Sequence, residues 1–516
     1  MSTFNAVHNH VLIASPSKRR NLRSLKGMTL EEKAIIRRMR ASNVPISQIW
    51  HYLGENAGGI DKLHFSKKDV NNQIVEENRR LVGIDVETTL AHFNIKQEDD
   101  PEFFFAIEPD SDGVVKNIVW IDGRARRAYA EFGDVVTFDT TYNTNKYCMP
   151  LGLFIGVNHH WQSIVFGACL LRNEQATNFI WLFRTWMQAM FNKAPKAIIT
   201  DQCPSMKAAI QEVFPSAVHR CCQWHVMKNA RDQLLVYYGS KNGFKEELRA
   251  VINRSLTVAN FERSWRKMLE KYKLEDNNHL KTMFVKQEEW VPAYFRGTFF
   301  AQMSTTQRSE GMNNVMKLLV DNHTSIYRFV LQLEKLVEGI WQRESDEDCR
   351  TINETPQLWS LNGMEVDARE VYTKKIFSLF KKRLKDSSNG SVVEIEQKRC
   401  YEVNITKHPS FPNWVPEIHK VCIDMTDVTV LCSCKGFEFS GLLCAHAIKV
   451  MQHVGMEHLL CKYVLKRWTK GANESVKMSI RERSTGTGES NELQSMRHAT
   501  LYPKVVQLVH LATKSV

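Results

Sequence analysis

Three cysteines and one histidine stand close together in the stretch "LCSCKGFEFSGLLCAHAIKV". Cys432 and Cys434 are two residues apart, and in an extended strand side chains at that spacing point to the same face. Cys444 and His446 have the same spacing but begin a helix-like run. Side chains two residues apart on a helix diverge, so both can reach one ion only at the start of the helix. That position also favours the thiolate form of a cysteine. Three sulfurs and one imidazole form a closed tetrahedral set, which predicts one structural zinc ion, Zn2+.

Two alternatives compete with zinc at this cluster. A reduced, half-buried group of cysteines without metal would need four soft ligands to share paired spacing by accident. A disulfide between Cys432 and Cys434 would be strained, because sulfurs two residues apart reach disulfide geometry only with distortion. Structural zinc therefore remains the prediction.

Two acidic residues end apolar runs that are typical of buried strands. "VVTFD" ends at Asp139, and "AIITD" ends at Asp201. If the two strands are neighbours, their carboxylates converge at one edge of a sheet and could hold a divalent cation such as Mg2+ for in-line attack at a phosphodiester. A third acid, Glu310 in "TTQRSEGMNN", would arrive from a helix. Each acid alone is more often a capping or turn residue, so only their joint placement favours a metal site.

A further pair of metal-binding side chains lies in "CCQWHVMKN", where a strand is expected to meet a helix. Cys222 and His225 are three residues apart and could form a second, corner metal site. Because only two ligands can be identified, the favoured interpretation is that these side chains brace the corner between the strand and the helix and bind no metal.

The apolar runs predict the elements that must position these residues. "FFFAIEP" and "KNIVWID", separated by "DSDG", predict a hairpin. Three further strands, "DVVTFD", "LGLFIGVN" and "QSIVFGACLL", precede the helix "QATNFIWLFRTWMQAMF", the strand "KAIITD" and a second helix. This strand–strand–strand–helix–strand–helix order predicts an α/β fold with an RNase H-like core.

The positive charge of the chain is concentrated near its beginning. The 516 residues carry a formal net charge of +12, and the length suits about three domains. Clustered basic residues indicate a polyanionic partner or a nuclear import signal, with a solvated helix face as the alternative. The candidate DNA-contacting or import residues are Lys18, Arg19, Arg20, Arg23 and Lys26.

The sequence predicts a reducing compartment and no membrane partner. The first residues contain histidines where a secretory signal would be apolar. The longest apolar stretches fall short of the ~18 residues that a membrane span needs. The predicted location is the cytosol or the nucleus.

Several stretches closely resemble Mutator-like transposases. They are "VVTFDTTYNTNKYCMPLGLFIGVNHH", "KAIITDQCPSMKAAIQEVFP", "CQWHVMKN" and "WVPAYFRGTFFAQMSTTQRSEGMNN". More closely still, they resemble the plant far-red-impaired-response family of regulators derived from such transposases. The cysteine-rich stretch resembles that family's SWIM zinc finger, Cys-x-Cys-x(n)-Cys-x-His. The likeness covers most of the chain from His8 to about residue 472.

The resemblance implies roles for particular residues. The transposase acidic triad would be Asp139, Asp201 and Glu310. These acids would either retain some catalytic activity or be a vestige of the transposase site. Cys432, Cys434, Cys444 and His446 would be the SWIM ligands. His8 and His10 match the histidines that close the family's N-terminal zinc finger.

Two departures from the family pattern affect these expectations. No cysteine precedes Cys148, so His8 and His10 lack the partners of a closed zinc site, and we expect no folded finger there and an N-terminally truncated chain. Cys203 stands where family members often have an acidic residue, and a thiol is a poor ligand for magnesium.

The predicted architecture is an RNase H-like transposase core with a helical insertion, plus a small ββα-type SWIM zinc finger. Thr29 and Glu32 are expected to form a capping box in a helical segment near the start, and "LKDSSNGS" is expected to be a linker. The predicted segments are a basic arm (1–27), a helix-turn-helix-like segment (28–75), the core (100–240), a helical insertion with a closing helix that carries Glu310 (241–345), a helical connector and linker (346–395), the SWIM region (396–470) and a largely disordered tail (471–516).

The resemblance favours a nuclear, DNA-associated transcription regulator that is not an enzyme. Its expected partners are DNA and other transcription regulators, with a homo- or heterodimer left open. One alternative is an active DDE-type transposase, because all three acids are retained. The other is a protein-interaction module whose DNA contact is non-specific.

Overall fold

The computed structural model describes residues 27–41, 44–80, 84–142, 144–303, 305–405 and 417–474. The basic arm with its five candidate residues, the remnant-finger histidines His8 and His10, and the predicted tail beyond residue 474 lie outside these ranges. The chain divides into two compact units. The first comprises Met1–Ile95, Asn143–Cys148 and Val315–Lys335, and the second comprises Lys96–Tyr142, Met149–Asn314 and Leu336–Val516.

The first unit is built from short helices around a small apolar core. Its elements are α2 (Leu30–Ala41), α3 (Ile46–Asn56), η1 (Ile60–Lys62), α4 (Lys67–Arg80) and the start of α5 (Asp85–Asp99). Ile36, Leu53 and Phe65 are buried between the helices. The predicted capping box is confirmed, because Glu32 N donates to Thr29 Oγ1 at 3.1 Å and Thr29 N donates to Glu32 Oε2 at 2.7 Å.

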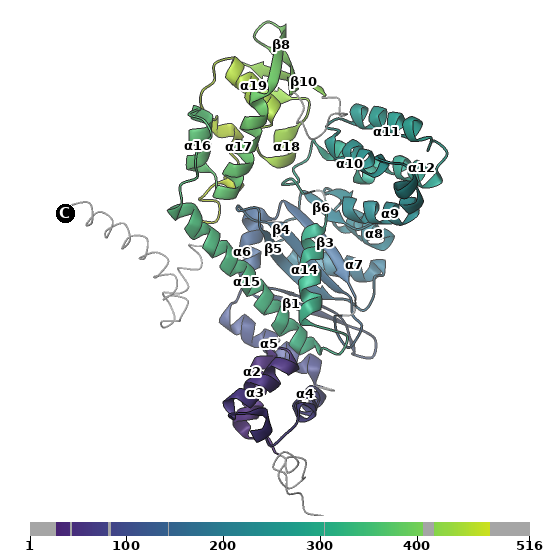
Figure 1. Cartoon of the computed structure of the whole chain (residues 1–516), viewed down its shortest axis with the longest axis vertical. Helices are drawn as coiled ribbons and strands as arrows, with labels where there is room; N and C mark the ends of the chain where they lie inside the picture. Colours follow the sequence, from purple (N-terminus) through teal and green to yellow (C-terminus); the bar gives the residue numbers. More distant parts are fainter. Residues whose placement is uncertain are drawn as a thin grey trace, which may run out of the picture. The chain divides into compact units, whose positions relative to one another are not determined.

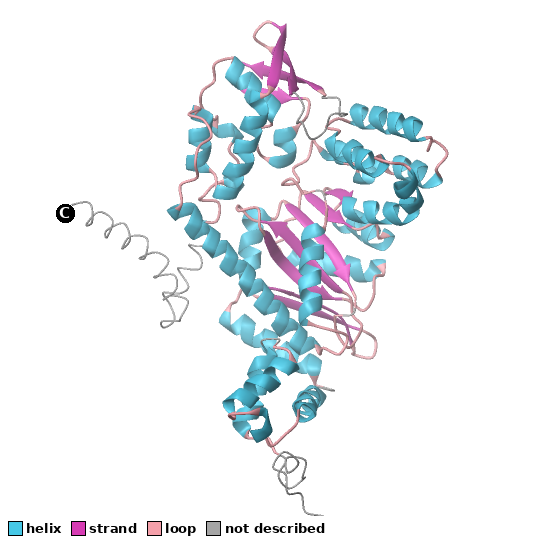
Figure 2. Ribbon diagram, in the orientation of Figure 1, coloured by secondary structure: helices cyan, strands magenta, loops and turns pink. Residues whose placement is uncertain are grey.

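The second unit contains a seven-stranded mixed sheet, drawn in magenta in Figure 2. Its strands lie in the order β1-β2-β5-β4-β3-β6-β7. β3 is antiparallel to β4 and parallel to β6, and β6 is parallel to β7. The predicted hairpin is confirmed as the β1–β2 pair. The strands are β1 (Phe104–Pro109), β2 (Val115–Ile121), β3 (Val135–Thr141), β4 (Leu151–Val157), β5 (Ser163–Leu170), β6 (Ala197–Thr200) and β7 (Val218–Cys221).

Side-chain alternation along β3 gives the two faces of the sheet different partners. Val136 and Phe138 point into an aromatic core beneath the sheet, formed with α6 (Gly123–Phe132), α7 (Ala176–Ala189) and α8 (Pro204–Val213). Thr137 and Asp139 point to the opposite face, which α14 (Gln307–Leu319) crosses (Figure 1). β3 therefore places apolar residues in the core and Asp139 under a helix.

A helical insertion separates β7 from α14. It has a core of its own, in which Phe244, Phe261, Trp265 and Trp290 are buried. The insertion is therefore a helical segment with its own core, and the chain returns to the sheet at α14. The elements are α9 (Gln223–Ser240), α10 (Phe244–Arg254), α11 (Val258–Tyr272), α12 (Asn278–Val285), α13 (Gln287–Trp290) and η2 (Pro292–Phe295).

The C-terminal part of the second unit holds a four-stranded antiparallel sheet in the order β11-β10-β9-β8. This sheet is larger than the predicted ββα finger. Cys400 and Cys422 form a disulfide between its facing strands β9 and β10, a bond that does not agree with the predicted reducing compartment. The elements after α14 are α15 (Ile326–Asn353), α16 (Gly363–Val371), α17 (Lys374–Ser388), β8 (Gly390–Glu396), β9 (Cys400–Ile405), β10 (Ile418–Asp424), β11 (Thr429–Cys432), α18 (Gly436–Ser440), α19 (Ala445–His453), η3 (Cys461–Tyr463) and η4 (Lys466–Trp468).

The predicted linker "LKDSSNGS" is wrong. These residues complete α17 and begin β8, with Asn389 alone between the two elements. The buried face of α17 contains Phe377, Phe380 and Leu384 at helical spacing. Packing of this face stabilises the helix although the residues at its end are polar. Ser387 is also buried and donates to Leu384 O at 2.7 Å, so its polar group is satisfied inside the helix.

The four-stranded sheet and its helices share one apolar core with the larger sheet. Arg467 donates to Val157 O at 2.7 Å and pairs with Asp134, which joins η4 to the end of β4 and the start of β3. Phe300 N donates to Phe439 O at 2.9 Å. The finger is thus packed within the second unit. Over the ranges that the structure describes, no helix is long and apolar enough to cross a membrane.

Candidate metal centres

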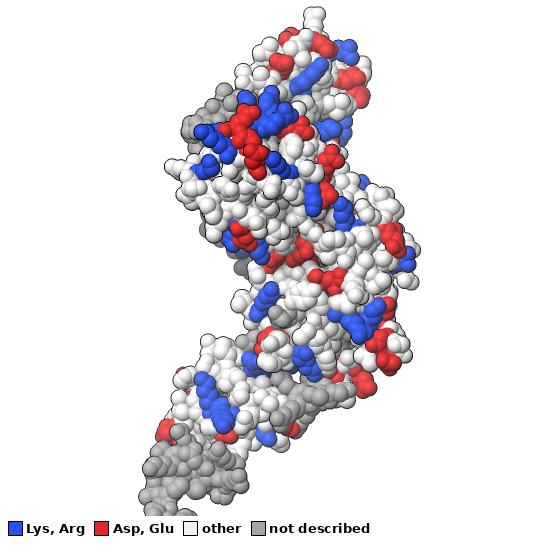
Figure 3. Space-filling view, turned by 90° about the vertical axis from the view of Figure 1, so that its right-hand side faces the viewer, with Lys and Arg blue, Asp and Glu red and all other residues white. Residues whose placement is uncertain are grey.

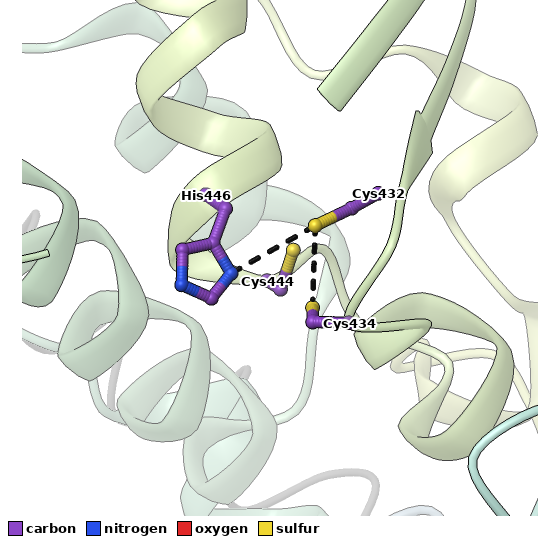
Figure 4. A group of neighbouring side chains, drawn as sticks. All are labelled: Cys432, Cys434, Cys444 and His446. Atoms are coloured by element: carbon purple, nitrogen blue, oxygen red, sulfur yellow. Dashed lines mark hydrogen bonds between the residues drawn. The ribbon is translucent and has the colours of Figure 1, made fainter. Parts of the chain in front are cut away.

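The four predicted zinc ligands come together at the junction of β11 and α19, as Figure 4 shows. Cys432 is the last residue of β11, and Cys434 lies in the turn that follows it. Cys444 is the N-cap of α19, and His446 lies in the first turn of that helix. The predicted straddling of the helix start is therefore confirmed. The strand ends earlier than expected, so a turn rather than strand alternation brings Cys434 beside Cys432.

The distances within this cluster suit zinc. The sulfurs of Cys432 and Cys434 are 3.3 Å apart, and Cys432 Sγ lies 3.8 Å from His446 Nδ1. All four ligand atoms lie within 4.8 Å of one another. A tetrahedron with Zn–S bonds of about 2.3 Å has edges of about 3.8 Å, so these atoms need little movement to bind one ion.

The surroundings of Cys444 favour its thiolate. Hydrogen bonds from the Cys432 and Cys434 thiols, followed by one from the Ala447 amide, lower the pKa of Cys444 well below its ordinary value despite burial. Ala447 N donates to Cys444 Sγ at 3.3 Å, at the positive end of α19. Cys444 is therefore prepared to act as an anionic ligand.

Two half-buried arginines hold the backbone around the ligands. Arg296 Nε donates to Cys434 O at 2.7 Å. Arg383 donates to Leu442 O at 2.6 Å and to Ser440 Oγ at 2.9 Å, which fixes the loop that leads to Cys444. These contacts orient the ligands from outside the coordination sphere.

The three predicted triad acids also converge, on the larger sheet. Asp139 lies on β3, and Asp201 directly follows β6. Because β3 and β6 are parallel neighbours, both acids lie toward the same edge of the sheet. Glu310 reaches them from the first turn of α14, and Thr137 Oγ1 and Ser309 Oγ anchor that helix at 2.8 Å.

His225 is the fourth member of this acidic cluster. Its Nε2 lies 2.9 Å from Glu310 Oε1, and the ligating atoms of Asp139, His225 and Glu310 lie within 4.8 Å of one another. Asn313 Nδ2 donates to Asp139 Oδ2 at 2.9 Å. Asn313 was missed by the sequence analysis, although it stands three residues after Glu310 and therefore on the same helix face.

Electrostatics couple the members of the acidic cluster. Burial, followed by the nearby Glu310 carboxylate, raises the pKa of Asp139 to about 7. Burial also raises the pKa of Asp201 above its ordinary value. Burial acts to lower the pKa of His225, but Cys222, Asp139 and Glu310 outweigh it and raise that pKa to about 9. The cluster therefore contains an imidazolium at neutral pH.

Cys222 contacts the segment before α14. Its sulfur accepts hydrogen bonds from Thr306 N and Thr306 Oγ1, both at 3.1 Å. Burial acts to raise the pKa of Cys222, but hydrogen bonds from His225 and Thr306 lower it below its ordinary value. The corner of Cys222 and His225 thus links the start of α9 to the segment before α14, which agrees with a bracing role.

Cys203 stands where an acidic residue was expected, and it contacts Asp201 through its backbone amide. It is the N-cap of α8, and its amide donates to Asp201 Oδ1 at 3.1 Å. Its thiol keeps an elevated pKa, chiefly because of burial. The side chain is therefore neutral at pH 7 and adds no negative charge to the cluster.

Comparison with known proteins matches the SWIM cluster and part of the acidic cluster, without Glu310, to family models. Residues 135–229 match the MULE transposase domain, and residues 423–455 match the SWIM zinc finger. The first range contains Asp139, Asp201 and His225, and the second contains all four sulfur and imidazole ligands. The chain thus carries a MULE transposase domain and a SWIM zinc finger.

Three proteins of Arabidopsis thaliana show the family. The chain is 33% identical to Protein FAR1-RELATED SEQUENCE 5 over 100% of its own length and 65% of that protein. It is 30% identical to Protein FAR-RED IMPAIRED RESPONSE 1, covering 91% of this chain and 56% of the relative. It is also 30% identical to Protein FAR1-RELATED SEQUENCE 9, over 79% of this chain and 74% of that relative. The chain therefore belongs to the far-red-impaired-response family, and it spans about half to three quarters of these relatives.

Proposed function

We propose that this chain is a nuclear, zinc-binding, DNA-associated transcription regulator in which a transposase core serves as a scaffold. The match to far-red-impaired-response proteins along the whole chain is the observation that carries this proposal. The sheet order β5-β4-β3-β6-β7, with its antiparallel and parallel pairs, supports an RNase H-like core. DNA, other transcription regulators and a second subunit are the partners we propose.

The hydrogen bonds of the acidic cluster support a scaffold role. Glu310 is paired with His225, and Asp139 accepts from Asn313. The imidazolium of His225 supplies positive charge where a nuclease would use a divalent cation. Side chains of the protein thus stabilise an arrangement that links β3, α9 and α14, in agreement with a regulator that is not an enzyme.

The DNA contact is assigned to the basic arm. Figure 3 shows one face of the described residues, on which Lys and Arg are interspersed with Asp and Glu. A mixed surface of this kind gives little net attraction for phosphates. Lys18, Arg19 and Arg20 supply a denser positive charge.

Duplex binding measured over a salt series tests this assignment. We expect affinity to fall as salt rises, and replacement of Lys18, Arg19 and Arg20 by alanine to reduce the slope by about 1 for each lost phosphate contact. The matched control replaces Lys33, Arg37 and Arg38 of α2 by alanine. Affinity that is indifferent to salt and to the arm would favour the protein-interaction module instead.

The convergence of Asp139, Asp201 and Glu310 favours a second candidate function, a DDE-type transposase. Three carboxylates at one sheet edge offer oxygen ligands of the kind that Mg2+ prefers. A strand-transfer assay with magnesium or manganese compares the wild type with Asp201→Asn. Products that depend on Asp201 would establish the enzyme, and their absence would leave the scaffold.

A further inference from the structure

A third group of metal-binding side chains lies away from both clusters described above. His159 and His160 occupy the turn between β4 and β5, and Asp348 lies on α15. The Nε2 atoms of His159 and His160 lie 3.0 Å and 3.1 Å from the same oxygen, Asp348 Oδ1. One ligand atom from each residue falls within 4.8 Å of the others. Two imidazoles and one carboxylate therefore share one centre.

The turn that carries the histidines is held rigidly. Asn158 Oδ1 accepts from His160 N at 3.0 Å and from Gln162 N at 2.9 Å. Thr373 Oγ1 donates to His159 O at 2.7 Å, and the Phe132 ring stacks on the His159 ring at 5.7 Å. The two imidazoles are thus positioned by their surroundings and not only by Asp348.

Hydrogen bonding alone leaves this buried group poorly satisfied. The side chains of His159 and His160 are 0% and 1% exposed. Both Nδ1 atoms and Glu344 Oε2 are buried without a hydrogen-bond partner. Buried polar groups are normally paired. The two Nε2 atoms share a single acceptor oxygen, Asp348 Oδ1, and these three atoms are the ones that a metal ion could join.

A second layer of polar side chains surrounds the centre. Glu344 lies one helical turn before Asp348 on α15, and its Oε1 is 3.8 Å from His159 Nδ1. Asn473 Nδ2 donates to Glu344 Oε1 and to Asp348 Oδ2, both at 3.3 Å. Histidines that bind a metal through one nitrogen commonly donate the other N–H to a carboxylate. Glu344 lies beside His159 Nδ1, although 3.8 Å is too long for a hydrogen bond.

We propose that His159, His160 and Asp348 bind a second zinc ion, which joins the β4–β5 turn to α15. Two imidazoles and one carboxylate are a ligand set that zinc uses, with the fourth position left to water. A tetrahedron with bonds of about 2.0 Å has edges of about 3.3 Å, close to the 3.0 Å and 3.1 Å separations. A divalent cation also offsets the negative charge of buried Glu344 and half-buried Asp348. The ion would tie the β4–β5 turn to α15.

The zinc content of the full chain, purified without chelator, tests the proposal. We expect two zinc ions per chain in the wild type, one in Asp348→Asn, one in Cys444→Ser and none in the double variant. Asp348→Asn keeps the size of the side chain and its hydrogen bond from Asn473. His458→Ala removes an exposed histidine that pairs with Asp367, and it should leave two zinc ions.

Cobalt substitution distinguishes the two sites by their ligands. In the wild type, the Cys3His site gives intense thiolate charge-transfer absorption, and the His2Asp site adds weaker visible bands. Asp348→Asn should lose one cobalt ion and keep the full charge-transfer intensity. A wild-type chain with a single zinc ion, or an Asp348→Asn chain whose metal content equals that of the wild type, would overturn the proposal. The wild-type stoichiometry decides the matter even where a variant fails to fold.

Discussion

The Nε2 atom of His225 lies 2.9 Å from Oε1 of Glu310, although the whole helical insertion separates the two residues in the sequence. This ion pair connects the start of α9 with the first turn of α14, so the insertion leaves and re-enters the sheet at one place. Asp139 lies within the same group and is held by Asn313. The acidic cluster is therefore a junction of three elements, and its protonation should influence stability.

Replacement of His225 by glutamine should destabilise the fold in a pH-dependent way. The pKa of His225 is raised from 6.5 to about 9, so its charge contributes stability that is complete below pH 6.5 and is lost as the pH rises through about 9. A shift of this size corresponds to about 3 kcal/mol, and partial solvent exposure reduces it to about 2 kcal/mol. Urea denaturation at about pH 6 and pH 10 measures the difference, which should vanish at the higher pH.

The control for this experiment is His51→Gln, which changes an exposed histidine of α3. We expect it to leave the denaturation midpoint unchanged at both pH values. A loss of stability in His225→Gln that is equal at pH 6 and pH 10 would show that packing, not charge, accounts for the role of the imidazole.

Asp139→Asn should stabilise the chain above neutral pH. Burial raises the pKa of Asp139 from 3.8 to about 7, so the wild type loses stability as the pH rises from about 4 through 7 and the buried carboxylate ionises. Asparagine carries no charge, and its side-chain oxygen can still accept from Asn313. We expect a gain of about 1–3 kcal/mol at pH 8 and none at pH 4, measured by urea denaturation. Asp112→Asn, at an exposed turn, is the control and should not alter the pH profile. A variant that is less stable than the wild type at pH 8 would contradict the prediction.

Cys444→Ser should remove the zinc ion of the SWIM cluster and unfold the segment from about residue 420 to 460, which carries the ligands. Cys444 caps α19 and supplies a thiolate, and folding of small zinc sites depends on the binding energy of the metal. Zinc analysis and limited trypsin digestion measure the two effects. Cys461→Ser changes an exposed free cysteine in η3 and serves as the matched control. Retention of the zinc ion by Cys444→Ser would exclude this residue as a ligand.

The sequence was most informative where a residue and its neighbours determine an element. The strand that carries Asp139 and the strand that Asp201 follows are apolar and short. The zinc ligands lie within 15 residues of one another (446 − 432 + 1). Local periodicity and motif spacing therefore predicted most strands of the larger sheet, the helix start at Cys444 and the convergence of the zinc ligands.

Local sequence patterns did not predict the contacts between segments that are distant in the sequence. The pairing of His225 with Glu310 depends on how the insertion returns to the sheet, and the disulfide of Cys400 and Cys422 depends on the register of β9 and β10. The linker prediction failed because composition describes the exposed face of α17, whereas buried Leu384 and Ser387 determine where the helix ends. Tertiary packing overrode propensity there.

Arg383→Met should weaken the zinc site without changing any ligand. The guanidinium donates to Leu442 O at 2.6 Å, to Leu443 O at 3.2 Å and to Ser440 Oγ at 2.9 Å, and methionine leaves these acceptors without their donor. Removing a half-buried donor from several acceptors costs about 1–3 kcal/mol, and loss of an outer-shell contact typically lowers metal affinity by about 10-fold to 100-fold. Zinc affinity is measured by competition with a chromogenic chelator, and Lys382→Met, an exposed neighbour on α17, is the matched control. Equal zinc affinity in Arg383→Met and Lys382→Met would show that the loop before Cys444 holds its shape without the arginine, and that the ligands alone organise the site.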